Sequence, residues 1–241
     1  MNSLVIDVKC GSGAFMGNID KARELCKAML AISKSFQRKT TCIISSMNKP
    51  LGKRVGNNLE IIEVIDFLKG NYKAYDDLYD EINHIVYELI LNIENVEYSF
   101  VKEKIKNVLD SGDAFEMLLK FVHNQGGDIS YIENINKFDK AKFETEILAE
   151  ASGYLSSYKL KDIAKTLNEL GAGRLKKEDN IDYTVGLINE KNIGDKIDKG
   201  DLLFTIRSNK ELCPMQIKKL KESVVYADSS INDTHILEVI K

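Results

Sequence analysis

The sequence has little excess charge of either sign, with 34 basic residues against 37 acidic ones and a net charge of −3. Proteins that bind nucleic acid or an anionic membrane through their overall field carry a strong basic excess, so we expect neither partner. No apolar run approaches the roughly 20 residues of a membrane-spanning helix, and Met1-Asn2-Ser3 leads into a strand pattern instead of a signal peptide. We therefore expect a cytoplasmic protein.

Disulfide and zinc patterns are also missing. The four cysteines, at positions 10, 26, 42 and 213, form no C-x-x-C pair, and the three histidines are too scattered for a zinc site. We expect reduced, mostly buried thiols and no catalytic zinc. A length of 241 residues is enough for one large domain or two modest ones.

The clearest pattern that is present lies at the start of the chain. The apolar run Leu4-Val5-Ile6 enters a glycine loop, residues 19–36 have the apolar spacing of an amphipathic helix, and residues 40–46 form a β-branched run. This order predicts a parallel βαβ unit with a right-handed crossover. A parallel strand needs neighbours on both sides, so residues 4–6 are expected to lie inside a larger sheet. Ligands of such sheets bind at the carboxyl ends of the strands.

Further elements follow from helical periodicity and glycine breaks. Helices are predicted over 59–68, 75–93, 100–110 and 114–123, the first opened by Asn57 and Glu60 as a variant of the capping box. Residues 146–158 read as a strand around Gly153, residues 159–170 as a helix that ends at Gly171, and 194–206 as a charged β-arch between two Gly-Asp turns. The predicted fold is α/β. Residues 1–137 form an incomplete mixed or parallel sheet with helices, and 138–241 form an α+β module resembling a barrel-sandwich hammerhead.

Two groups of residues are candidates for chemistry. Gly11-Ser12-Gly13 could present backbone amides to a phosphate, although a tight turn is the favoured interpretation. Lys9 is expected to pair with a neighbouring carboxylate such as Asp7. A loop with the carbonyls of Leu51 and Arg54 turned inward, together with the Glu63 carboxylate, could hold a cation through oxygen ligands. The sequence by itself favours a solvated helix residue at Glu63.

These motifs together resemble the pyrimidine-nucleoside phosphorylase and thymidine phosphorylase family. The resemblance runs in order through essentially the whole chain and corresponds to the C-terminal part of a family chain nearly twice as long. It is carried by residues 5–9 with Gly11-Ser12-Gly13-Ala14-Phe15-Met16, Met47 with Pro50-Leu51-Gly52, Val55-Gly56-Asn57 with Leu59-Glu60, Leu170-Gly171-Ala172-Gly173-Arg174, Lys177-Glu178-Asp179, Ile181-Asp182, Val185-Gly186 and the arch from Gly194-Asp195 to Gly200.

The resemblance implies a pentosyltransferase of pyrimidine nucleoside salvage, a glycosyltransferase that uses inorganic phosphate as co-substrate. Phosphate attacks C1′ of uridine, thymidine or deoxyuridine and gives the free base and a (deoxy)ribose 1-phosphate. It also implies that Phe15 forms an apolar wall of the base pocket. Leu51 and Arg54, through their carbonyls, and Glu63, through its carboxylate, form the C-terminal share of a potassium site. Several relatives have a small residue at the position of Arg54, so only its backbone role carries over.

The resemblance also implies that the main catalytic groups lie outside this sequence. The family's phosphate-binding Lys-His-Ser loop, its pyrimidine-gripping Arg and Ser-x-x-x-Lys helix, and its dimer-forming helices have no counterpart here. We expect no catalytic residue in this chain and little or no activity from it alone. An N-terminal half supplied as another polypeptide would restore the site. The alternatives are a catalytically inactive remnant and a scaffold or partner-binding module.

Overall fold

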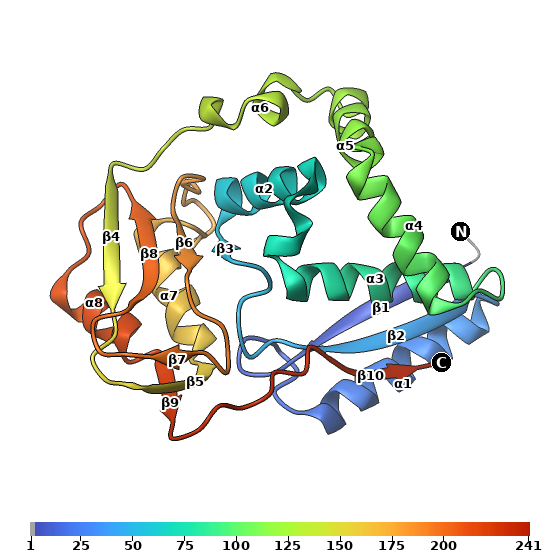
Figure 1. The fold of residues 1–241 in the computed structure, drawn as a ribbon, viewed down its shortest axis with the longest axis horizontal. Helices are drawn as coiled ribbons and strands as arrows, with labels where there is room; N and C mark the ends of the chain where they lie inside the picture. Colours follow the sequence, from blue (N-terminus) through green and yellow to red (C-terminus); the bar gives the residue numbers. More distant parts are fainter. Residues whose placement is uncertain (1–2) are drawn as a thin grey trace.

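The computed structural model describes residues 3–241 and shows a mixed α/β architecture with three separate sheets and no closed barrel in that range (Figure 1). In the first sheet the strand order is β1-β2-β10, formed by β1 (Ser3–Cys10), β2 (Lys39–Ser46) and β10 (Ile236–Ile240). Strands β1 and β2 are parallel, and α1 (Ile19–Ser35) connects them. The predicted βαβ unit is therefore confirmed, whereas β10, which pairs antiparallel with β2, was not anticipated.

The two faces of this sheet have different characters because side chains alternate along a strand. Val8 of β1 and Ile44 of β2 pack with Cys26 of α1 in one apolar cluster. On the opposite face, Lys9 makes a polar contact with α3 (Asp76–Leu91), and Thr41 makes one with Asn92, the residue that caps the end of α3. One face is therefore a simple apolar core and the other carries buried polar groups.

Most of residues 57–137 are helical. The helical elements are α2 (Asn57–Asp66), the π-helical turn η1 (Phe67–Asn71), the 3-10 turn η2 (Tyr72–Ala74), α3, α4 (Tyr98–Asp110), α5 (Asp113–Asn124), α6 (Ser130–Glu133) and the 3-10 turn η3 (Ile135–Lys137). The predicted helices and the glycine breaks between them are confirmed. The predicted cap of α2 is wrong by one residue, because Gly56 precedes the helix and its amide donates to Glu60 Oε1 at 2.9 Å.

Two further sheets, both antiparallel, form what we call the second part of the molecule. One has the order β3-β6-β8-β4, from β3 (Arg54–Val55), β6 (Gly186–Asn189), β8 (Leu202–Ser208) and β4 (Phe143–Leu148); the other has the order β7-β5-β9, from β7 (Lys196–Ile197), β5 (Gly153–Tyr158) and β9 (Val224–Ala227). The strand predicted over 146–158 is wrong as one element. The chain turns after Leu148, so β4 and β5 lie in different sheets.

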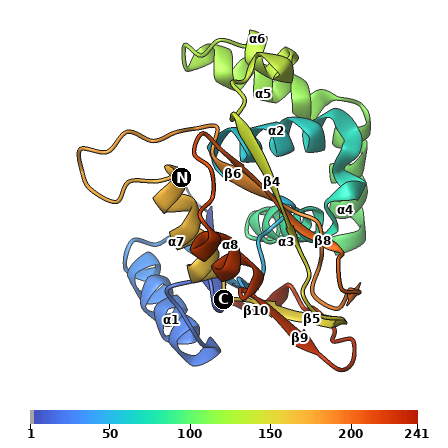
Figure 2. The same ribbon diagram turned by 90° about the vertical axis from the view of Figure 1, so that its left-hand side faces the viewer.

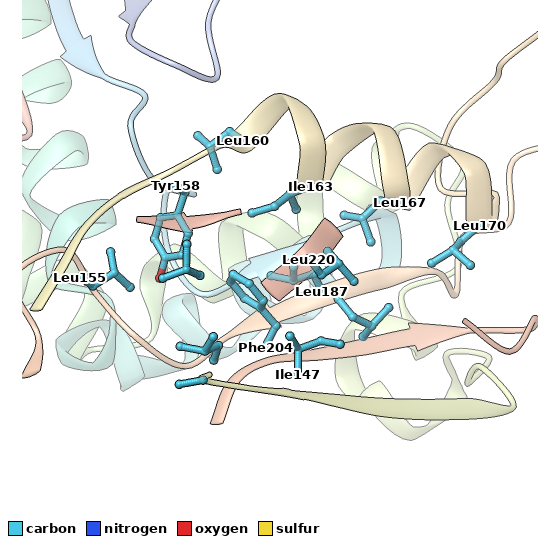
Figure 3. Close-up of a cluster of buried hydrophobic side chains, with 14 of the residues drawn as sticks. Ile147, Leu155, Tyr158, Leu160, Ile163, Leu167, Leu170, Leu187, Phe204 and Leu220 are labelled. Atoms are coloured by element: carbon cyan, nitrogen blue, oxygen red, sulfur yellow. The ribbon is translucent and has the colours of Figure 1, made fainter. Parts of the chain in front are cut away.

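Helix α7 (Leu160–Leu170) supplies the core of the second part, and α8 (Pro214–Lys221) packs beside it. Ile163, Leu167 and Leu170 recur at the spacing of one helix face and point toward Phe204 and its neighbours on the strands (Figure 3). The helix ends at Gly171, whose φ of +119° is the left-handed conformation predicted for its cap.

The two parts are interleaved along the chain. Strand β3 leaves the first part to join the sheet of the second (Figure 1), and β10 returns from the second part to the first sheet (Figures 1 and 2). The loop between β2 and α2 consequently lies where the two parts meet. The proposed division at residues 137 and 138 stays a prediction.

Cys10, Cys26 and Cys42 are buried free thiols, whereas Cys213 is free and exposed. Within residues 3–241, no helix has the length and apolar character needed to cross a membrane.

Candidate functional site

The Glu63 carboxylate is enclosed by residues 51–54, which we call the cage loop. Glu63 is only 4% exposed, and its Oε2 accepts hydrogen bonds from the amides of Lys53 at 2.9 Å and Arg54 at 3.0 Å. The interpretation of Glu63 as a solvated helix residue is therefore wrong. Its position one helical turn beyond the buried Leu59 was the available signal, since residues i and i+4 share a helix face.

Gly52 explains how the loop approaches the carboxylate so closely. Its φ of +69° lies in the left-handed region, and a Cβ atom built there would stand 2.1 Å from Glu63 Oε1. A side chain at this position would collide with the carboxylate. The cage loop therefore depends on glycine for its conformation and for space.

The electrostatic balance at Glu63 leaves the negative charge incompletely compensated. Burial raises the pKa of Glu63, while the amides of Lys53 and Arg54 and the charge of the Arg54 guanidinium act in the opposite direction without cancelling burial. Asp77 adds to the upward shift. A cation near this carboxylate would favour its ionised form.

The carbonyl of Arg54 is oriented by the pairing of β3. The Lys53 carbonyl accepts from the Asn189 amide at 2.6 Å, and Arg54 lies opposite Ile188 of β6. The amide of Arg54 points instead toward Glu63. Because the N–H and C=O of one residue in an extended strand face the same side, the Arg54 carbonyl also faces away from β6. The loop thus combines a buried carboxylate with a carbonyl that the sheet does not use.

Three partly buried charged residues hold the cage loop in place. Asp77 Oδ2 lies 3.3 Å from both the Gly52 amide and Lys49 Nζ, and Lys49 Nζ pairs with Asp233 Oδ2 at 2.8 Å. Sequence reasoning missed these three charged residues. Asp233 gives no local signal, because its contact depends on the return of the C-terminal segment. Across residues 3–241 no cluster of three His, Cys, Asp or Glu side chains suits a metal ion, so a cation here would need backbone oxygens.

Residues 11–16, the glycine loop, follow β1 and use their amides internally. The amide of Gly11 donates to the Met16 carbonyl at 3.0 Å, that of Gly13 to the Met47 carbonyl at 2.9 Å, and that of Ser12 to Asn48 Oδ1 at 3.0 Å. These donors are not free to cradle a phosphate. The tight-turn interpretation is the one that the geometry supports.

Phe15 lies at the rim of the glycine loop and is fully exposed. It borders a hollow of about 350 Å³ that Met16, Met29 and Met47 also line. Lys9 reaches the same hollow, and its ammonium pairs with Asp7 at 2.9 Å and Glu81 at 2.6 Å, which confirms the expected ion pair with Asp7. The structure therefore brings Arg54 and Glu63 together, with Leu51 next to Gly52 in the cage loop, and places Phe15 on a separate, open surface.

The chain is similar in sequence to known proteins. Residues 154–227 match the family model described as the pyrimidine nucleoside phosphorylase C-terminal domain. The chain is 38% identical over 240 residues to the pyrimidine-nucleoside phosphorylase of Staphylococcus aureus strain bovine RF122 / ET3-1, a match that covers 99% of this chain and 55% of the relative. The corresponding protein of strain USA300 has the same identity and coverage.

Over nearly its whole length the chain is therefore similar to the C-terminal part of pyrimidine-nucleoside phosphorylases, and residues 154–227 match the C-terminal domain model of that family. The resemblance predicted from the motifs, to the C-terminal part of the pyrimidine-nucleoside phosphorylase family, is thereby confirmed. The chain spans about half the length of the curated relatives it matches.

Proposed function

We propose that this chain acts as the C-terminal part of a pyrimidine-nucleoside phosphorylase, a pentosyltransferase of nucleotide salvage. In the proposed reaction, inorganic phosphate attacks C1′ of uridine, thymidine or deoxyuridine and releases the free base and a (deoxy)ribose 1-phosphate. The observation that carries this proposal is the 38% identity to pyrimidine-nucleoside phosphorylases over 99% of the chain. We also propose that the protein is cytoplasmic and that residues 138–241 form a module resembling a barrel-sandwich hammerhead.

Phe15 is proposed to form an apolar wall of the base pocket. An exposed aromatic ring at the carboxyl end of a parallel strand is costly to leave in water unless another surface covers it, and a flat pyrimidine ring suits such a wall. The hollow beside Phe15 is open, so the other walls would come from groups outside this sequence.

The cage loop is proposed to hold K⁺ through the carbonyls of Leu51 and Arg54 and the carboxylate of Glu63. The residues present fit such an ion, because the site offers a buried carboxylate and a carbonyl unused by the sheet. Oxygen ligands of this kind suit hard cations. A bound cation would balance the Glu63 charge at the junction of the two parts of the molecule.

The groups that grip phosphate and pyrimidine are proposed to come from a polypeptide segment outside these 241 residues, together with the helices of the family homodimer. Within residues 3–241, β1 has a partner strand on one edge only. Its free edge could accept a strand from such a segment. We therefore expect the chain to be inactive alone.

The test is complementation. The chain would be co-expressed with the N-terminal segment of the S. aureus relative that lies outside the match, and uracil release from uridine would be measured with and without phosphate. We expect the two polypeptides to co-purify and to release uracil only with phosphate, whereas the chain alone releases none. Phosphate-dependent release by the chain alone would overturn the need for a second segment. Failure of any complex to form or to act would favour the remnant or scaffold alternatives.

A further inference from the structure

The C-terminal segment, residues 228–241, crosses from the second part of the molecule back to the first sheet (Figure 1). In the second part, the Ser230 hydroxyl donates to the Gly194 carbonyl at 2.9 Å. At the other end, β10 pairs with the edge of β2, and the His235 carbonyl accepts from the Ser46 amide at 2.7 Å. The segment therefore ties the two parts of the molecule together.

Asp233 of this segment reaches the cage loop through two charged side chains. Its Oδ2 atom lies 2.8 Å from Lys49 Nζ, which lies 3.3 Å from Asp77 Oδ2. The same Asp77 oxygen accepts from the Gly52 amide at 3.3 Å. The three charged side chains are between 11% and 18% exposed, so salt screens their charges less than it would at the surface. One carboxylate oxygen is thus shared by the cage loop and by a lysine that the segment holds.

His235 makes a matching arrangement one helical turn further along α3. Glu81 follows Asp77 by four residues, so both carboxylates lie on one face of the helix. Glu81 Oε2 contacts both His235 Nε2 and Lys9 Nζ, the latter at 2.6 Å. Lys9 in turn lines the hollow beside Phe15. Each of the two α3 carboxylates therefore joins one residue of the segment to one lysine of a candidate binding region.

The distances at Lys49 indicate how the segment acts on the cage loop. The Lys49 ammonium lies closer to Asp233 than to Asp77, so Asp233 draws it away from Asp77. Without the Asp233 carboxylate, the ammonium is free to move onto Asp77 Oδ2, where it competes with the Gly52 amide. A charged donor makes a stronger hydrogen bond than a neutral amide, so the bond to Gly52 is the one that weakens.

We propose that the C-terminal segment positions both candidate binding regions: Asp233 orients the cage loop, and His235 orients the lysine beside Phe15. Both are positioning residues, because each acts through another side chain and neither contacts a ligand. The part that the two regions play in a phosphorylase rests on the proposed function. The positioning itself does not depend on that function, because it is a property of these contacts within the chain.

The experiment records amide and side-chain NMR signals of the isotope-labelled chain, together with amide hydrogen exchange. In Asp233→Asn, we expect the Gly52 amide signal to move and its exchange to quicken at least about fivefold, with the Lys9 side-chain signals unchanged. In His235→Gln, we expect the Lys9 Cε signal to move, with the Gly52 amide unchanged. Each variant should affect only its own region, which a general loosening of the fold would not do.

Two control variants locate the effect. Asp228→Asn removes the same charge from an exposed position of the segment, where Asp228 forms no ion pair within the described residues, and should change neither region. Asp233→Glu restores the carboxylate and should return Gly52 exchange to within about twofold of the wild-type rate. Asp233→Ser replaces Asp233→Asn if the latter does not fold. An unmoved amide signal of the buried Leu187 confirms that a variant is folded.

The outcomes separate this inference from the proposed function. An unchanged Gly52 amide in Asp233→Asn, or an unchanged Lys9 in His235→Gln, would overturn the positioning role. Changes in both regions in each variant would show a general loosening and would also overturn it, as would an equal Gly52 change in Asp228→Asn. None of these signals requires activity, so a failed complementation would overturn the proposed function and leave the positioning result in place.

Discussion

The glycine loop and the cage loop follow adjacent parallel strands, yet they satisfy their polar groups in opposite ways. The glycine loop bonds its own amides to nearby carbonyls and an Asn side chain, and leaves Phe15 exposed. The cage loop directs two amides at the buried Glu63 carboxylate and is held by partly buried ion pairs. The glycine loop therefore presents an apolar surface, whereas the cage loop surrounds a buried negative charge.

This difference shows what each loop can contribute to a site. The amides of residues 11–14 are already used and are not free for an anion, so the contribution of the glycine loop is the shape and apolarity of Phe15. A loop built around an incompletely balanced carboxylate can respond to a cation. Substitutions in and near the two loops test this difference.

Glu63→Ala is expected to have the largest effect on stability. It leaves two buried amides without an acceptor and opens a cavity, so we expect the free energy of unfolding to fall by about 3–4 kcal/mol. Urea unfolding measures the change. The exposed Glu116 of α5 provides a control, because Glu116→Ala should change stability by less than about 0.5 kcal/mol. A similarly small loss for Glu63→Ala would mean that the cage is not formed.

Gly52→Ala should follow at about 2–3 kcal/mol, because it adds a methyl group against Glu63 Oε1 and forces a left-handed backbone. Gly112→Ala is the matched control, since Gly112 also has a positive φ of +83° but nothing within 4 Å of the added Cβ. It should cost only the backbone strain, about 1 kcal/mol. Equal losses in the two variants would show that the contact with Glu63 contributes nothing.

Glu81→Gln tests the ion pairs beneath the glycine loop and should cost about 2 kcal/mol, because Lys9 keeps its contact with Asp7 while His235 loses its carboxylate. Burial acts to raise the pKa of Glu81, but the contacts with His235 and Lys9 outweigh it and lower the pKa below 4.5. A lowered carboxyl pKa stabilises the fold above its unfolded value, and this contribution is lost as the pH falls through the folded value.

The difference in unfolding free energy between the wild-type chain and Glu81→Gln should therefore shrink on acidification below about pH 4.5. Urea unfolding at a series of pH values would follow it. A difference that grows on acidification would contradict the assigned direction.

Phe15→Ala should have the smallest effect on stability, within about 0.5 kcal/mol, because the ring is fully exposed. In the complemented enzyme the same variant should raise the KM for uridine several-fold, as expected for lost contact with the base. Leu175→Ala, at another exposed apolar position, is the control and should leave the KM unchanged. A large loss of stability for Phe15→Ala would make this residue structural.

Much of the fold followed from local patterns. The β-branched run before Ser46 and the helical spacing around Cys26 determine the βαβ unit, and Gly171 ends α7 as predicted. Strands β3 and β10 were missed because each is specified by a distant partner. The two-residue β3 exists through pairing with β6, and β10 through pairing with β2 almost 200 residues earlier in the chain.

For the candidate site, the sequence predicted which residues take part but not how they are arranged. The resemblance supplied Leu51, Arg54 and Glu63, and the structure brings them together. Neither the resemblance nor periodicity indicated the partly buried Lys49–Asp77–Asp233 contacts, because these join three separate segments. The burial of the Arg54 Nη1 atom could not be predicted either, since burial of part of a long charged side chain depends on the packing around it.

The most direct test of the account is an NMR titration of the Glu63 side-chain carboxyl in the isotope-labelled chain, with Glu63→Gln used to assign the signal. We expect the pKa of Glu63 to lie above the ordinary value of 4.5, because burial outweighs the two amides and the Arg54 charge. A pKa at or below 4.5 would show a solvated or fully compensated carboxylate and would contradict the claim that the cage loop encloses an incompletely balanced charge.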